Sequence, residues 1–131
     1  CDERDASAYE RVGRLRLALH DRVRAKIALE RAAALGEEYC TYDPSDLGMI
    51  YLTSRSLKYC AGGDKSLLKR AADYGERLIL REPMSFHGIV NLSDIYRRLE
   101  KRDKAEQLLK KAQAFDPENR AVKKLESLMA S

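Results

Sequence analysis

The sequence predicts a single all-α domain, and three observations carry this prediction. Apolar residues recur at spacings of three and four along nearly the whole chain, as they do on the buried face of a helix. The breaks between these stripes are short and hold Asp, Pro and Gly, which are typical of helix ends. The chain has 131 residues, of which 44% are hydrophobic and 35% charged, and this suffices for one hydrophobic core.

The first expected hairpin covers about residues 7–36. Its first helix is indicated by Tyr9, Val12, Leu15 and Leu19, which share one face at helical spacing. After a break near His20-Asp21, a second stripe runs through these residues: Ala25, Leu29, Ala32 and Leu35. Gly36 is expected to end the second helix, because glycine is costly inside a helix and common just after one.

The second expected hairpin covers about residues 43–82. Asp43 suits the helix cap and Pro44 the first turn, so a helix is predicted from here to about Ala61. Gly62-Gly63 ends that helix. Asp64 then caps a long helix that reaches about Arg81, where Glu82-Pro83 closes it.

The third expected hairpin covers about residues 85–116, with Ser85 as the first cap and Asp103 as the second. Asp116-Pro117 closes it. A last amphipathic helix, residues 118–130, carries Val122, Leu125 and Leu128 on its apolar side. We therefore expect three hairpins and one terminal helix, joined by short connections.

The third hairpin resembles the tetratricopeptide repeat (TPR). The residues that match the first helix of that motif are Ile89, Leu92, Ser93 and Tyr96; those that match its second helix and closing proline are Ala105, Leu109, Ala112 and Pro117. The first hairpin has the same spacing without a gap, and small residues such as Gly13 and Ala25 would let its helices approach closely. The middle hairpin departs from the motif, since about five extra residues separate Ser54 from Ala71.

This resemblance implies three tandem TPR-like helical hairpins wound as a short right-handed superhelix, with residues 118–130 as a capping helix. In such proteins the first helices line a concave groove that holds a peptide. The groove positions carried over by register are these: Arg14, Tyr51, Arg55, Lys58, Asn91 and Arg97. Because most of them are cationic, an acidic segment or a free C-terminal carboxylate is the expected ligand. A partner docked on the convex face or at an end of the array, with these arginines as ordinary solvated side chains, is the alternative.

The first residue, Cys1, suggests a mature bacterial lipoprotein, in which the cysteine after the signal peptide carries the lipid. Residues 1–6 are then a tether, residues 7–131 the fold, and Asp2 slightly favours the inner membrane. Acyl chains on Cys1 would anchor the protein, since each buried methylene contributes about 0.8 kcal/mol. No other cofactor is expected.

Cys40 and Cys60 are the remaining cysteines. They could form a disulfide in the periplasm, but the helix expected between them spans about 24 Å at about 1.5 Å per residue. A disulfide needs Cα atoms within about 7 Å, so pairing would require that helix to break near Gly48.

The sequence carries no pattern typical of an enzyme. His20 and His87 lie in different hairpins, no cysteine pair has metal-ligand spacing, and no phosphate-binding loop or small-molecule substrate site is indicated. The net charge of +4 arises from 25 basic and 21 acidic residues that are interleaved, which argues against a nucleic-acid partner.

The function expected from these observations is that of a non-catalytic protein–protein interaction scaffold. One hypothesis is a lipid-anchored accessory or assembly subunit of a bacterial envelope complex, on the periplasmic face of a membrane. The alternative is a cytoplasmic TPR adaptor or chaperone-like regulatory module.

Overall fold

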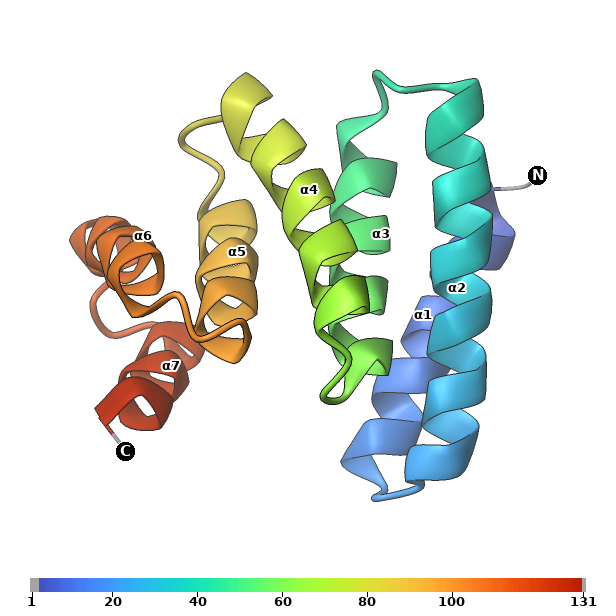
Figure 1. Cartoon of the computed structure of the whole chain (residues 1–131), viewed down its shortest axis with the longest axis horizontal. Coiled ribbons are helices and arrows are strands. Elements are labelled where there is room, and N and C mark those ends of the chain that lie inside the picture. The colour runs from blue at the N-terminus through green and yellow to red at the C-terminus, as the bar shows by residue number, and fades with distance from the viewer. Residues whose placement is uncertain (1–2, 131) are drawn as a thin grey trace.

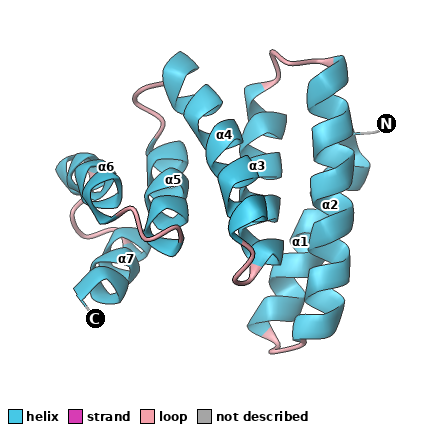
Figure 2. Cartoon of the chain, in the orientation of Figure 1, coloured by secondary structure: helices cyan, strands magenta, loops and turns pink. Residues whose placement is uncertain are grey.

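The computed structural model describes residues 3–130, and within this range it contains seven α-helices and no strand (Figures 1 and 2). The helices are α1 (Glu3–Ala18), α2 (Arg22–Tyr42), α3 (Leu47–Ala61), α4 (Lys65–Arg81), α5 (Phe86–Arg98), α6 (Arg102–Phe115) and α7 (Arg120–Ala130). The predicted all-α fold is confirmed. No described helix is long and apolar enough to cross a membrane.

The helices form three consecutive hairpins: α1 with α2, α3 with α4, and α5 with α6. Helix α3 also contacts both α1 and α5, so the first helices of the hairpins follow one another along one side of the molecule. Helix α7 packs on α5 and α6 at the far end (Figure 1). Its residues Val122, Leu125 and Met129 are buried. Met129, and not Leu128, therefore completes the apolar side expected for this helix.

Small residues lie where the two helices of each hairpin cross. A Cβ atom on Gly13 would stand 2.5 Å from Leu29 Cγ, so only glycine fits there without a shift. Ser54 Oγ donates a hydrogen bond to the Ala71 carbonyl at 2.7 Å. Ser93 Oγ does the same to the Ala105 carbonyl at 2.7 Å. The extra residues of the middle hairpin thus lie between Ser54 and Ala71.

Helix caps explain most of the boundaries. Asp64 accepts hydrogen bonds from the backbone N–H groups of Ser66 and Leu67, at 2.9 and 3.4 Å. Ser85 accepts one from Gly88 at 3.2 Å. Both residues are the predicted N-caps, and each satisfies backbone donors that the first helical turn leaves unpaired.

The prediction that the second helix ends at Gly36 is wrong. The helix continues to Tyr42, because Gly36 serves a helix contact: a Cβ atom there would lie 2.2 Å from Thr53 Oγ1. The close approach of α2 and α3 outweighs the roughly 1 kcal/mol that glycine costs inside a helix.

Two other predicted caps are displaced. Asp43 ends α2, and its side chain accepts bonds from the backbone and hydroxyl of Ser45 at 3.2 and 2.7 Å. Asp46 caps α3 instead, accepting from the Met49 N–H at 3.1 Å. Helix α6 begins one residue before Asp103, whose carboxylate lies in the first turn.

The start of the fold also differs from the prediction. Helix α1 begins at Glu3, and Ala6 is fully buried in the core with Cys40, Met49 and Ile50. Of the expected tether, residues 3–6 therefore belong to the first helix, and Ala6 is part of the core. Cys1, the expected lipidation site, lies outside the described residues.

Candidate partner-binding groove

The six residues predicted for the groove all lie on the first helices of the hairpins. Arg14 is on α1; Tyr51, Arg55 and Lys58 are on α3; Asn91 and Arg97 are on α5. Since α3 contacts both of the other helices, Arg55 and Lys58 occupy the middle of this face. Their charged ends lie on two carboxylates, the buried Glu10 and the partly buried Asp94. Sequence analysis did not identify either carboxylate as an anchor.

The first carboxylate, Glu10 on α1, is 2% exposed. Its Oε2 lies 2.8 Å from Arg55 Nη2, and Arg14 pairs with its other oxygen. The Arg55 guanidinium also donates to the Tyr51 hydroxyl at 3.2 Å and lies 4.9 Å from the centre of that ring. Burial lowers the pKa of Arg55, but Tyr51 and Glu10 outweigh burial and hold the pKa above its ordinary value. Arg55 therefore stays charged.

The second carboxylate, Asp94 on α5, binds three cations. Lys58 Nζ lies 3.2 Å from Oδ2, Arg98 Nε lies 3.3 Å from the same oxygen, and Arg97 Nη2 lies 2.7 Å from Oδ1. Burial raises the pKa of Asp94, but Lys58, Arg98 and Arg97 outweigh burial and hold the pKa below its ordinary value. Asp94 is thus a carboxylate in the folded protein.

Lys58 is the most deeply buried of these cations, at 5% exposure. Burial lowers the pKa of its amine to about 8, against the opposing effect of Asp94, and Arg98 and Arg55 lower it further. The amine also lies 4.5 Å from the centre of the Tyr59 ring. Lys58 therefore titrates much nearer to neutral pH than an ordinary lysine does.

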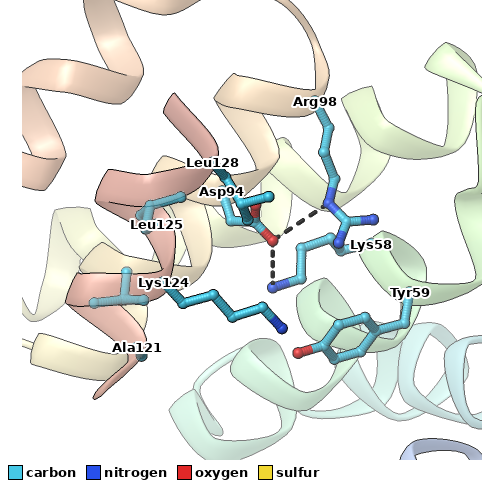
Figure 3. Close-up of a pocket in the computed structure, with 9 residues that line it drawn as sticks. Lys58, Tyr59, Asp94, Arg98, Ala121, Lys124, Leu125 and Leu128 are labelled. Atoms are coloured by element: carbon cyan, nitrogen blue, oxygen red, sulfur yellow. Dashed lines mark hydrogen bonds and ion pairs between the residues drawn. The ribbon is translucent and has the colours of Figure 1, made fainter. Parts of the chain in front are cut away.

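The two clusters leave the face positive. Together the clusters contain two carboxylates and five cations. Lys124 of α7 extends into the same region (Figure 3) and forms no ion pair with any described residue. The cations predicted as ligand donors are therefore partly neutralised by carboxylates of the chain itself, but their sum exceeds that neutralisation. A carboxylate ligand would meet an attractive field here.

Two adjoining hollows run along this face, with volumes of about 140 and 160 Å³. Both are lined by Lys58, Tyr59 and Val90. Helix α7 provides part of the wall of the first hollow through Leu125 and Leu128 (Figure 3). Sequence analysis assigned α7 only a capping role, so this wall was missed. The hollows combine cations with aromatic and aliphatic surface, which suits a peptide side chain.

Asn91 lines the second hollow and is 4% exposed. Its amide nitrogen donates to Ser54 Oγ at 3.0 Å, whereas its Oδ1 has no hydrogen-bond partner among the described residues. Arg55 Nε is likewise without an acceptor there. A buried polar atom without a partner costs free energy, so this hollow holds one unused acceptor and one unused donor.

The other sequence-predicted site residues lie apart from this groove. Cys40 and Cys60 are both free and buried. The Cys40 thiol lies 3.7 Å from Thr53 Oγ1, and the Cys60 thiol donates to the Leu57 carbonyl at 3.6 Å. Burial raises the pKa of the Cys60 thiol to about 11, so it is protonated at neutral pH. Residues 3–130 hold no group of three or more His, Cys, Asp or Glu side chains placed to bind a metal ion.

A spacing signal for the two anchors is present in the sequence. Arg14 follows Glu10 by four residues, and Arg97 and Arg98 follow Asp94 by three and four, so each pair shares a helix face. The partners supplied by α3 give no such signal, because they are distant in sequence. Comparison of the chain with models of protein families and with curated proteins gives no match.

Proposed function

We propose that this chain is a non-catalytic protein-interaction scaffold, a short TPR-like array whose groove binds a carboxylate-bearing peptide. The observation that carries the proposal is the face formed by α1, α3 and α5, where five cations outnumber the two carboxylates that hold them. Its adjoining hollows are lined by aromatic and aliphatic side chains. The ligand is an acidic segment or a free C-terminus, which share the same chemistry.

The TPR-like character is supported by a correspondence between the first and third hairpins. His20 and Glu100, which stand 80 positions apart, both have positive φ, at 61° and 62°. The following residues, Asp21 and Lys101, donate to carbonyls five positions earlier, at 2.8 and 2.9 Å. The small residues at the helix crossings are also 80 positions apart: Gly13 corresponds to Ser93, and Ala25 to Ala105. Two hairpins with matching turns and crossings are expected of a repeat.

The test uses a short fluorescent peptide rich in Glu and Leu, with a free C-terminus, and an amidated copy of it. Fluorescence anisotropy should show binding that weakens as salt rises, because exposed charges are screened. Equal affinity of the two peptides would assign the contact to the acidic side chains. Loss of affinity on amidation would assign it to the terminal carboxylate.

The deciding variant is Lys124→Glu, because Lys124 is exposed, lines the first hollow and supports no described ion pair. Reversal of its charge should weaken binding about tenfold, or about 1.4 kcal/mol. The matched control is Lys123→Glu, the same change at the neighbouring position of α7 and outside both hollows. If neither peptide binds, or if the two variants weaken binding equally, the groove is not the site.

Arg55→Glu is a poor test of binding. Arg55 holds the buried Glu10, and a second carboxylate at this place would oppose the first in a poorly solvated position. We expect that substitution to destabilise the fold, which would remove binding for a reason unrelated to the ligand.

A further inference from the structure

The first helices of the first and third hairpins correspond at an offset of 80 positions, but one of their faces differs in exposure. On α5, three residues of this face are 0% to 8% exposed: Leu92, Ile95 and Leu99. On α1, the residues at the same positions are 46% to 63% exposed: Val12, Leu15 and Leu19. We name these last three residues the α1 stripe. The same apolar pattern is thus covered on one helix and open on the other.

Helix α4 covers this face of α5 (Figure 1). A Cβ atom on Gly75 of α4 would lie 2.9 Å from Leu92 Cδ1, and one on Gly88 of α5 would lie 3.3 Å from Ile79 Cδ1. The residues of α4 that belong to this contact recur at spacings of four, three and four, on one side of the helix: Leu68, Ala72, Gly75 and Ile79. The covering helix is therefore amphipathic, with a small residue at the point of closest approach.

A polar contact borders the covered face. The Tyr96 hydroxyl of α5 donates a hydrogen bond to the Glu76 carboxylate of α4. The residue of α1 that corresponds to Tyr96 is Arg16. Its guanidinium lies 3.8 Å from Asp21, at the long end of the range for an ion pair. An acid placed on α1 as Glu76 is placed on α5 would therefore meet a cation.

No described helix covers the α1 stripe, since α1 contacts only α2 and α3 within residues 3–130. Gly13 lies against Leu29 of α2, and Glu10 pairs with Arg55 of α3. At 100° per residue, the α1 stripe lies on the opposite side of the helix from these contacts. It is also separate from Arg14, the residue of α1 that borders the peptide groove.

We propose that the α1 stripe binds an amphipathic helix of a partner protein, in the arrangement that α4 has on α5. The partner helix presents a small residue to Val12, aliphatic side chains on both sides of it, and an acid to Arg16. A continuous apolar stripe on a helix is stable when another element covers it. The proposal rests on the correspondence between the two hairpins and does not depend on the peptide groove.

A second copy of the chain fits this surface less well. Two α1 stripes packed on each other would bring together the arginines that border them, Arg11 and Arg16, and neither copy would supply an acid there. The side of α4 that suits the α1 stripe is already buried in the fold of each copy. Charge and shape therefore favour a helix from a different protein.

The experiment uses a peptide of residues 64–81, which is the α4 sequence with its Asp64 cap, labelled with a fluorophore at its N-terminus and amidated at its C-terminus. We expect fluorescence anisotropy to show that it binds the purified chain. The peptide has no terminal carboxylate, and its five basic residues outnumber its three acidic ones, so it does not suit the positive groove. Lys124→Glu, the variant that tests the groove, should leave its affinity unchanged.

Two substitutions in the chain locate the contact. Leu15→Gln should weaken binding about tenfold, because a leucine buried by the peptide is lost. The matched control is Leu80→Gln, at an exposed leucine on α4, which should have no effect. Arg16→Glu should also weaken binding about tenfold. A peptide that carries Glu76→Arg should restore the affinity for this variant, which shows that the variant is folded and that the two positions meet.

The proposal is overturned if the peptide does not bind, or if Leu80→Gln weakens binding as much as Leu15→Gln does. It is also overturned if the Glu76→Arg peptide does not restore binding to Arg16→Glu, because the peptide would then lie elsewhere, for example in place of the chain's own α4. Analytical ultracentrifugation gives the last outcome. A dimer that Leu15→Gln converts to monomer would identify a second copy as the occupant and would also overturn the proposal.

Discussion

The Glu10 and Asp94 clusters each hold a carboxylate on the first helix of a hairpin; the side chain of Glu10 is 2% exposed and that of Asp94 is 15% exposed. In each cluster, cations come from the same helix and from α3. Glu10 receives an arginine from α3, and Asp94 receives a lysine. The pKa of Arg55 is raised, whereas that of Lys58 is lowered to about 8. A guanidinium with several donors keeps its charge when buried, while an ammonium with one close partner loses part of its preference for the charged form.

The largest effect is expected from Asp94→Asn. It removes the acceptor shared by three cations and leaves Lys58 buried without a carboxylate, so we expect a loss of about 3–5 kcal/mol in the free energy of unfolding. Urea denaturation followed by circular dichroism measures this change. A loss below 1 kcal/mol would mean that Lys58 reaches water when Asp94 is neutral.

Glu10→Gln is expected to cost less, about 1–3 kcal/mol. The side chains of Arg55 and Arg14 are 22% and 45% exposed, so both can turn toward solvent once the carboxylate is gone. The control is Glu118→Gln. The Glu118 side chain is 84% exposed and lies 3.9 Å from Lys123, so this substitution should not measurably change the free energy of unfolding. Equal costs for Glu10→Gln and Asp94→Asn would contradict the proposed difference between the two clusters.

Lys58→Met should give the smallest change: its free energy of unfolding at neutral pH should lie within about 1 kcal/mol of that of the original protein. The substitution removes a costly buried charge, and Arg97 and Arg98 still accompany Asp94. A loss of several kcal/mol would show instead that the ammonium contributes strongly to the fold.

The difference in free energy of unfolding between the original protein and Lys58→Met should depend on pH. The pKa of Lys58 is about 8 in the fold and 10.5 ordinarily, so between these values the unfolded chain binds more protons. The free energy of unfolding should therefore rise with pH relative to that of Lys58→Met, by about 1 kcal/mol between pH 7 and pH 9. A difference that stays constant over this interval would show that Lys58 titrates as an ordinary lysine.

Much of the fold could be predicted from local signals. Asp64 and Ser85 cap helices because their side chains bond to N–H groups two or three residues away, which any chain segment can do by itself. The predicted groove residues do lie on successive first helices. Their internal ion pairs were not predicted, because the relevant distances join residues remote in sequence.

The apolar stripe predicted for α1 does not mark its buried face, since Val12, Leu15 and Leu19 are exposed. The amino-acid sequence by itself determined the seven helices, most of their breaks and the small residues at the hairpin crossings. Each depends on spacing within a few turns. Tertiary structure alone decided that Gly36 continues α2 against Thr53, and that Arg55 meets Glu10 across 45 positions. The physical reason is the same in both cases. Close packing and loss of solvent set the free energy of these residues, and neither exists until distant helices come together.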